Sequence, residues 1–138
     1  TYKDYELILV DDGSTDGSYA LMKQYAKRYN QIKAYTKENT GPGMTRKFGF
    51  EKATGDLLFF VDSDDWIEKK TCEILNRLAS DYKADTVIFG LNFVFDSGKV
   101  IRSKRGMAGL TDKNMCMKYF AAKLDCLGYW HLAQLKYQ

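Results

Sequence analysis

Residues 5–16 read Tyr-Glu-Leu-Ile-Leu-Val-Asp-Asp-Gly-Ser-Thr-Asp, and this stretch sets the pattern for the rest of the chain. The apolar run over residues 5–10 predicts a buried strand that ends at a polar loop, residues 11–16. Apolar residues then recur three and four positions apart over residues 16–29. That spacing predicts an amphipathic helix with Thr15 or Asp16 capping its first turn.

The same alternation of strand and helix continues toward the C-terminus. A loop containing Gly41-Pro42-Gly43 is expected over residues 36–43, because these residues disfavour regular structure. Strands are expected over residues 32–35, 57–61 and 85–95, and helices over 44–53, 68–80 and 111–124. Strands that alternate with helices predict an α/β fold whose parallel strands carry helices on both faces.

Composition excludes several classes of protein. Of the 138 residues, 45% are hydrophobic, 28% are charged and one is proline, which disfavours collagen-like and disordered chains. The longest apolar runs are about five residues, too short to span a bilayer. The three cysteines, Cys72, Cys116 and Cys126, form no Cys-x-x-Cys pair, which argues against a disulfide framework or a zinc site and favours a reducing compartment.

Charge is unevenly distributed along the chain. The net charge is +3, but residues 1–96 carry 13 basic and 16 acidic residues, whereas residues 97–138 carry 8 and 2. The basic C-terminal segment favours contact with an anionic partner. Among the aromatic residues, we expect Trp66, Phe89, Phe93 and Phe95 to pack in the core, although Trp66 could also stack on a sugar.

Acidic residues follow the strand predicted over residues 57–61. If the extended conformation continues, Asp62 and Asp64 point to the same side, because side chains repeat every two residues in a strand. Two carboxylates in one small volume repel each other, and Mg²⁺ or Mn²⁺ relieves that repulsion while binding phosphate. Alternatively, Asp64 and Asp65 cap a helix that begins at Trp66.

The Asp11–Asp16 loop follows the first strand in the same way. Its carboxylates could accept hydrogen bonds from a base N–H or a sugar hydroxyl. The alternative is an Asx-turn, with Gly13 in the tight bend and Asp16 capping the helix. Because ligands of open α/β sheets bind beyond the carboxyl ends of the strands, we expect both acidic loops to share one edge.

Phosphate-binding glycine motifs are absent from the sequence. Neither Gly-x-Gly-x-x-Gly nor Gly-x-x-x-x-Gly-Lys-Ser/Thr occurs, so a phosphate ligand would be held by metal and basic side chains. Arg46 and Lys47, early in the helix predicted over residues 44–53, are suitable cations for a diphosphate or a base. The alternative is that both lie on a solvated helix face.

Three blocks together resemble family 2 glycosyltransferases with the GT-A fold. They are residues 5–17, Asn39-x-Gly41 followed by Arg46, and residues 53–65, which read Ala-Thr-Gly-Asp-Leu-Leu-Phe-Phe-Val-Asp-Ser-Asp-Asp. Residues 84–90 and 128–132 more loosely resemble bacterial members that build surface polysaccharides. The resemblance implies an incomplete three-layer α/β sandwich with a mainly parallel central sheet.

The resemblance also implies a donor and a metal. The donor would be a nucleotide sugar, most often a UDP-sugar, and the acceptor a glycan or glycolipid hydroxyl. Asp12 would bind the uracil with Asp11 beside it, and Arg46 would lie near the nucleotide. Asp62 would contact the ribose or the metal, Asp64 would ligate Mn²⁺ or Mg²⁺, and Asp65 would be a neighbour in the substrate site. The metal would stabilise charge on the leaving nucleoside diphosphate.

Relatives place an inverting catalytic base downstream of the segment that resembles residues 130–137. We therefore expect a single catalytic-domain fragment that is inactive alone, with residues 1–95 binding nucleotide sugar and metal and residues 96–138 beginning the acceptor side. Its base would be outside the chain, because Asp125 and His131 are poor substitutes. A cytoplasmic location, peripheral membrane contact and a homodimer are further expectations.

Two other functions remain open on the sequence alone. A metal-dependent nucleotidyltransferase also presents aspartates at strand ends, and would select a nucleoside triphosphate. A non-catalytic scaffold could use the basic segment to bind anions. We expect no nucleic-acid partner, because the segment contains no aromatic-basic RNA motif.

Overall fold

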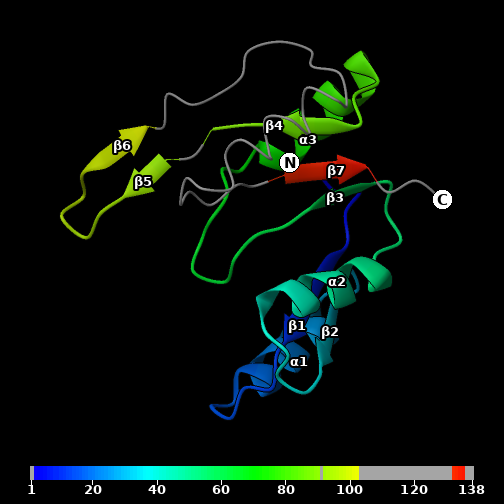
Figure 1. The fold of residues 1–138 in the computed structure, drawn as a ribbon, viewed down its shortest axis with the longest axis vertical. Helices are drawn as coiled ribbons and strands as arrows, with labels where there is room; N and C mark the ends of the chain where they lie inside the picture. Colours follow the sequence, from blue (N-terminus) through cyan, green and yellow to red (C-terminus); the bar gives the residue numbers. More distant parts are fainter. Residues whose placement is uncertain (1, 91, 103–131, 136–138) are drawn as a thin grey trace. The chain divides into compact units, whose positions relative to one another are not determined.

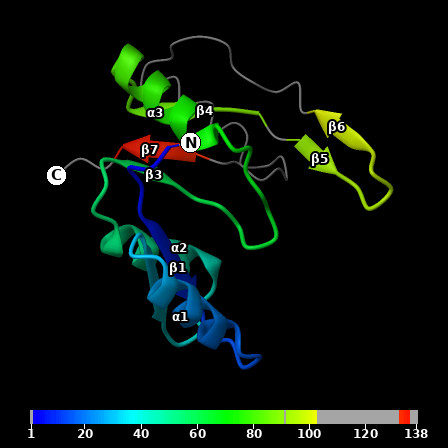
Figure 2. The same cartoon turned by 180° about the vertical axis from the view of Figure 1, so that it is seen from behind.

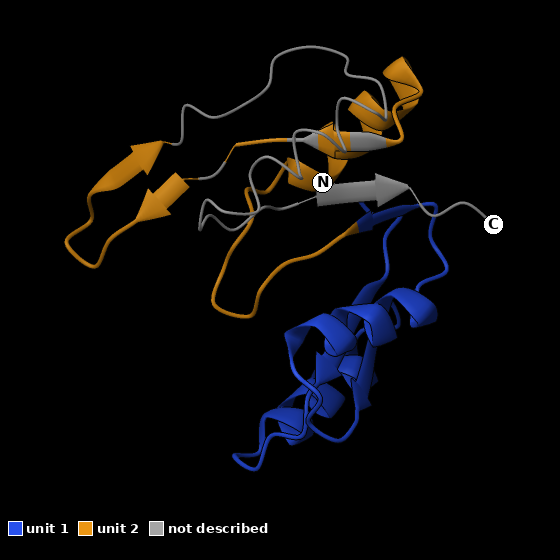
Figure 3. Ribbon diagram, in the orientation of Figure 1, with its two compact units in different colours: residues 1–58, 136–138 blue, residues 59–135 orange. Residues whose placement is uncertain are grey.

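The computed structural model describes residues 2–90, 92–102 and 132–135, and divides into two compact units (Figure 3). The first unit comprises residues 1–58 and 136–138, and the second comprises residues 59–135. The helix predicted over residues 111–124 lies outside the described residues. Within the described part of the chain, no helix has the length and apolarity that crossing a bilayer would require.

The first unit is a strand-helix-strand-helix arrangement: β1 (Leu7–Asp11), α1 (Ser18–Arg28), β2 (Ile32–Thr36) and α2 (Pro42–Lys52). β1 and β2 pair in parallel, with Leu7 opposite Ile32 and Asp11 opposite Thr36. α1 packs mainly on β2 and α2 on β1. The helices lie on opposite faces of this two-stranded sheet, α2 in front in Figure 1 and α1 in front in Figure 2. The predicted α/β alternation is therefore confirmed in this unit.

Glycine and proline set the starts of both helices. Gly17 has a φ of 86°, so α1 begins at Ser18 and not at residue 16. The Asp16 carboxylate accepts a hydrogen bond from the Ser18 N–H at 3.0 Å, which satisfies one free donor of the first turn. α2 begins at Pro42, two residues before the predicted start, because proline needs no N–H partner there and its φ already suits a helix.

The second unit contains the remaining elements. They are α3 (Thr71–Tyr82), β4 (Thr86–Ile88), β5 (Asn92–Val94), β6 (Val100–Arg102) and β7 (Leu132–Leu135), and β3 (Leu57–Phe59) spans the boundary between the units. A three-stranded sheet has the order β3-β7-β4, and β4 runs antiparallel to β7. α3 packs on β4, where Leu75, Ala79 and Val87 are buried.

Three predicted elements of this region are corrected. The strand predicted over residues 57–61 ends at Phe59. Its neighbour in the sheet, β7, is itself only 4 residues long, which limits the length of pairing. The helix predicted over 68–80 begins at Thr71, after a turn in which the Thr71 N–H bonds the Glu68 carbonyl. The strand predicted over 85–95 divides into β4 and β5 because Gly90, a residue disfavoured in strands, lies between them.

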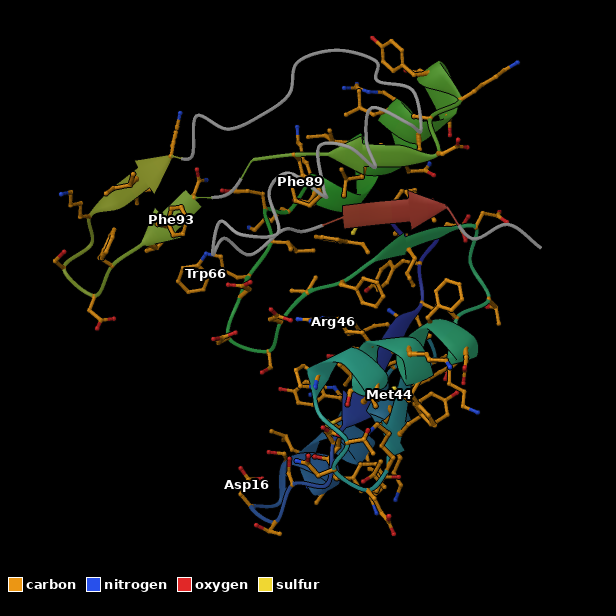
Figure 4. The ribbon with its side chains drawn as sticks, in the orientation of Figure 1. Asp16, Met44, Arg46, Trp66, Phe89 and Phe93 are labelled. Atoms are coloured by element: carbon orange, nitrogen blue, oxygen red, sulfur yellow. The ribbon has the colours of Figure 1, made fainter. Side chains whose placement is uncertain are left out.

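β5 and β6 form an antiparallel hairpin around a turn that contains residues 96–98. Gly98 takes a φ of 79°, and its N–H bonds the Phe95 carbonyl at 2.8 Å. Phe93 and Phe95 are exposed, so their predicted core positions are wrong, because the three-residue strands of the hairpin bury neither side chain. Phe89 does pack, edge to face on Phe59 (Figure 4).

Trp66 is also not a core residue. It lies on the segment between β3 and α3 and is 79% exposed (Figure 4). The residue sits in an irregular connection, not at the start of a helix, so no regular apolar face is available to cover it.

Candidate functional site

Asp11 closes β1 and is 5% exposed. Its Oδ2 accepts the Thr36 hydroxyl at 2.8 Å, and its two oxygens accept the Ser14 N–H at 3.3 and 3.2 Å. Hydrogen bonds from the Ser14 and Thr36 side chains lower the pKa of Asp11 and hold it ionised. The Asp11 carboxylate bonds the N–H three residues on, not two as in the predicted Asx-turn, and it anchors the loop after β1.

Asp12 faces the loop that follows β2. Its Oδ1 accepts the Lys37 ammonium and the Thr40 N–H, the latter at 3.1 Å, and its Oδ2 accepts the Gly41 N–H at 2.9 Å. The Lys37 ammonium, more than any other group, lowers the pKa of Asp12 from 3.8 to about 2, against the opposing effect of partial burial. Asp12 is thus an ionised acceptor, fixed beside Gly41, which is the residue before α2.

Backbone contacts join the two loops independently of the ammonium. The Lys37 N–H bonds the Asp11 carbonyl at 3.1 Å. Gly13 has a φ of 78°, and a Cβ there would lie 3.0 Å from the Asn39 nitrogen. Only glycine permits both this backbone conformation and this approach, so the predicted bend at Gly13 also brings the loop over residues 37–41 against β1.

Arg46 lies on α2 and is exposed (Figure 4). The preceding residue, Thr45, donates its N–H and its hydroxyl to the Gly41 carbonyl, at 3.1 and 2.9 Å. Asp12 and α2 belong to the same compact unit, and Gly41, which binds Asp12, directly precedes that helix. We refer to Asp12 and its partners Lys37, Thr40 and Gly41 as the Asp12 cluster. The structure therefore places a cation on the helix that starts directly after this cluster.

Asp62, Asp64 and Asp65 lie in the second unit, after β3. The Asp65 N–H bonds the Asp62 carbonyl at 3.0 Å, which makes residues 62–65 a turn. The strand does not continue into these residues, so the side-chain alternation predicted for Asp62 and Asp64 is wrong. The predicted helix cap is also wrong, because α3 begins only at Thr71.

The turn nevertheless suits a hard cation. Asp64 and Asp65 are exposed and Asp62 is partly buried, so three carboxylates lie within four residues of the chain. In the described part of the chain, no three His, Cys, Asp or Glu side chains gather into a metal-binding group. Mg²⁺ typically takes only one or two protein carboxylates and completes its shell with water and phosphate, so this donor set fits such an ion. The approach of this turn to Asp12 stays a prediction, as the two belong to different units.

Sequence reasoning missed two contributors to the first unit. Lys37, directly after β2, neutralises Asp12; a basic residue at the end of the neighbouring strand was the available signal. Glu6 accepts Lys33 at 2.7 Å, the Thr54 hydroxyl at 2.9 Å and the Gly55 N–H at 3.0 Å. Burial opposes ionisation, but these donors together lower the pKa of Glu6 from 4.5 to about 2.

Comparison with known proteins is consistent with this arrangement. The family model described as glycosyl transferase family 2 matches residues 1–132. EpsH of Bacillus subtilis, a protein named as a glycosyltransferase, is 42% identical over 104 residues, which are 75% of this chain and 30% of EpsH. The glycosyltransferase GlyA of Streptococcus pneumoniae is 38% identical over 88 residues, 64% of this chain and 13% of GlyA.

A third relative is the cholesterol galactosyltransferase of Borreliella burgdorferi. It is 38% identical over 87 residues, which are 63% of this chain and 24% of that protein. The chain therefore spans less than a third of the length of each of these relatives.

Proposed function

The chain belongs to glycosyl transferase family 2 and has its GT-A fold, and from that premise we propose that the protein transfers a sugar from a nucleoside-diphosphate donor to a hydroxyl of a glycan or glycolipid. The observation that carries this proposal is the Asp12 cluster. Asp12 is an ionised carboxylate fixed at the carboxyl end of a parallel strand, and it bonds Gly41, the residue before α2. α/β sheets bind nucleotides beyond that end of their strands.

Uridine is the nucleoside that we propose for the donor. Oδ1 of Asp12 already accepts two donors and Oδ2 accepts the Gly41 N–H. The Thr45 hydroxyl also reaches Asp12, but its one proton can go to the Gly41 carbonyl instead, which leaves capacity for one more hydrogen bond. The imide N–H of uracil is a single donor and matches that capacity. Asp11 supports this contact without touching the base, because it is 5% exposed and its carboxylate is bound by Ser14 and Thr36.

The diphosphate is proposed to lie between a metal ion and basic side chains. Asp64 would hold Mn²⁺ or Mg²⁺, with Asp62 as a second ligand or ribose contact and Asp65 beside them. When bound, the ion would stabilise negative charge on the departing nucleoside diphosphate. Arg46, exposed on α2, supplies a further positive charge that suits a phosphate oxygen or the base.

Transfer with inversion also needs a group that removes the proton of the acceptor hydroxyl. Asp125 and His131 lie outside the described residues, and we assign this role to neither. Peripheral membrane contact, through the basic residues 97–138, would suit a glycolipid acceptor and is part of the proposal.

Calorimetric titration of the full-length protein with UDP, with and without Mn²⁺, tests this function. We expect Mn²⁺-dependent binding that weakens about tenfold or more in Asp12→Ala, because a charged acceptor is lost. Asp16→Ala is the matched control. Asp16 lies in the same loop, but its carboxylate accepts the N–H and the hydroxyl of Ser18, so the substitution should leave UDP affinity unchanged.

Two results would contradict the proposal. Equal UDP affinity in Asp12→Ala and the unmodified protein would remove Asp12 from the site. Selective binding of UTP over UDP and UDP-sugars would favour a nucleotidyltransferase instead.

A further inference from the structure

The Lys37 side chain has no spare donor. Its ammonium carries three N–H groups, and these meet Asp12 Oδ1, the Glu38 carbonyl at 2.9 Å and the Thr40 hydroxyl. The side chain is 14% exposed, so it is held in place and largely withdrawn from water. A lysine bound in this way is poorly placed to contact a phosphate itself, and its effect must pass through Asp12.

That effect is to limit what Asp12 can accept. A carboxylate offers about four lone-pair sites, two on each oxygen. Lys37 and the Thr40 N–H fill Oδ1, and the Gly41 N–H takes one site on Oδ2. The Thr45 hydroxyl also reaches Asp12, but its single proton can go to the Gly41 carbonyl, 2.9 Å away. With the proton on that carbonyl, one acceptor site remains for a ligand, on one oxygen of Asp12. A ligand group with two adjacent donors, which needs both oxygens, cannot be satisfied.

We propose that Lys37 is a positioning residue that selects the nucleobase, by reducing Asp12 to a single acceptor that suits the one N–H of uracil and disfavours guanine. Guanine presents a ring N–H and an exocyclic amine side by side, and a carboxylate with both oxygens available would bind them together. With Oδ1 filled, one guanine donor loses its water without gaining a partner, which is costly. This inference rests on the proposed role of Asp12 in nucleotide binding.

The loop does not depend on the ammonium for its course. The Lys37 N–H bonds the Asp11 carbonyl, the Thr40 and Gly41 N–H groups bond Asp12, and Gly13 packs against Asn39. None of these contacts uses the Lys37 side chain. A substitution that removes the ammonium therefore leaves the loop anchored and frees one acceptor site on Asp12.

The test compares UDP and GDP affinities, measured by calorimetry with Mn²⁺ on the full-length protein and on Lys37→Met. We expect the preference for UDP over GDP to fall about tenfold in Lys37→Met, because GDP gains a second hydrogen bond to a charged group. Loss of the positive charge affects the diphosphates of both ligands alike and cancels in this ratio. Lys37→Arg keeps a cation on Asp12 and should restore most of the preference.

Thr40→Val provides a second variant in case Lys37→Met unfolds, since it removes one anchor of the ammonium and keeps the side-chain shape. We expect a smaller fall in the UDP preference and a melting temperature close to that of the unmodified protein. If both variants keep the full preference while the unmodified protein binds UDP through Asp12, the inference is overturned and the proposed function stands. If the unmodified protein binds no UDP, both are overturned.

Discussion

Two groups of aspartates in this chain follow strands, and they differ in what holds them. Asp11 and Asp12, at the end of β1, are fixed by N–H and O–H donors and by Lys37, and their pKa values are lowered. Asp64 and Asp65, in the turn after β3, are exposed. The first group is held by donors on several sides, whereas Asp64 in the second group lies exposed in a turn, where a cation can reach its carboxylate.

The comparison shows that similar acidic motifs can serve different chemistry. Both stretches place acidic residues after an apolar run, and composition alone gives them equal claim to a metal. The neighbouring segment decides the outcome. Thr36, at the end of β2, bonds Asp11, and Lys37 and two backbone N–H groups from the loop after β2 bond Asp12. A carboxylate already paired with an ammonium is a weaker candidate for Mn²⁺, because the metal would have to displace that cation.

Asp64→Asn is the strongest way to break this comparison. If the exposed turn binds the metal, the variant should lose Mn²⁺-dependent UDP binding by about 100-fold, because a neutral amide is a poorer ligand for a hard cation. Calorimetric titration of UDP with and without Mn²⁺ measures the effect. Asp96→Asn, in the exposed turn of the β5–β6 hairpin, is the matched control and should bind normally. Equal Mn²⁺ dependence in the two variants would remove Asp64 from the metal site.

Glu6→Gln sharpens the comparison, since Glu6 is a third carboxylate held by donors. We expect a loss of about 2 kcal/mol in the free energy of unfolding at neutral pH, because Gln keeps the acceptor but not the charge that pairs with Lys33. Urea denaturation measures it. Glu51→Gln, at an exposed position of α2, should change stability little.

The pH dependence of that loss has a definite sign. Folding lowers the pKa of Glu6 from 4.5 to about 2, so its stabilising contribution is complete above 4.5 and disappears as the pH falls toward 2. The difference in stability between the unmodified protein and Glu6→Gln should therefore narrow across this window. A difference that stays constant with pH would show that the charge of Glu6 is unimportant.

Gly13→Ala is the smallest perturbation and tests the contact that brings the loop over residues 37–41 against β1. A left-handed backbone and a Cβ only 3.0 Å from the Asn39 nitrogen predict a loss of about 1 to 2 kcal/mol in unfolding free energy. Gly43→Ala, inside α2 with open space at its Cβ, should instead be neutral or stabilising. Thermal denaturation compares the two, and equal melting temperatures would contradict the prediction.

Local pattern predicted the elements of the first unit but not their contacts. The runs over residues 5–10 and 32–35 were enough for β1 and β2, and the apolar spacing over residues 16–29 was enough for α1. The Asp12 cluster was not predictable in detail because its donors come from Lys37, Thr40 and Gly41, 25 to 29 residues away. The one indication in the sequence was that these donors follow the strand predicted to lie parallel to β1, so that their loop and Asp12 are at the same edge of the sheet.

The region after β3 was harder, since regular periodicity ends there. Phe60 and Val61 continue the apolar run but not the strand, because pairing, and not hydrophobicity, sets strand length. Asp62–Asp65 then form a turn, as the hydrogen bond from the Asp65 N–H to the Asp62 carbonyl shows. The carboxylates of these residues lie close together in sequence in either conformation, and the metal site stays a prediction.

The Glu6 carboxylate has a consequence for how the first unit assembles. It joins partners 27 residues away at Lys33 and 48 residues away at Thr54, so both chain loops must close before its bonds can form. We expect such long-range contacts to form after the local hydrogen bonds of α1 and α2. The Glu6 hydrogen bonds therefore depend on correct assembly of the unit. If β2 slipped by one residue, or α2 ended early, Lys33 or Thr54 would not lie where Glu6 can accept its hydrogen bond.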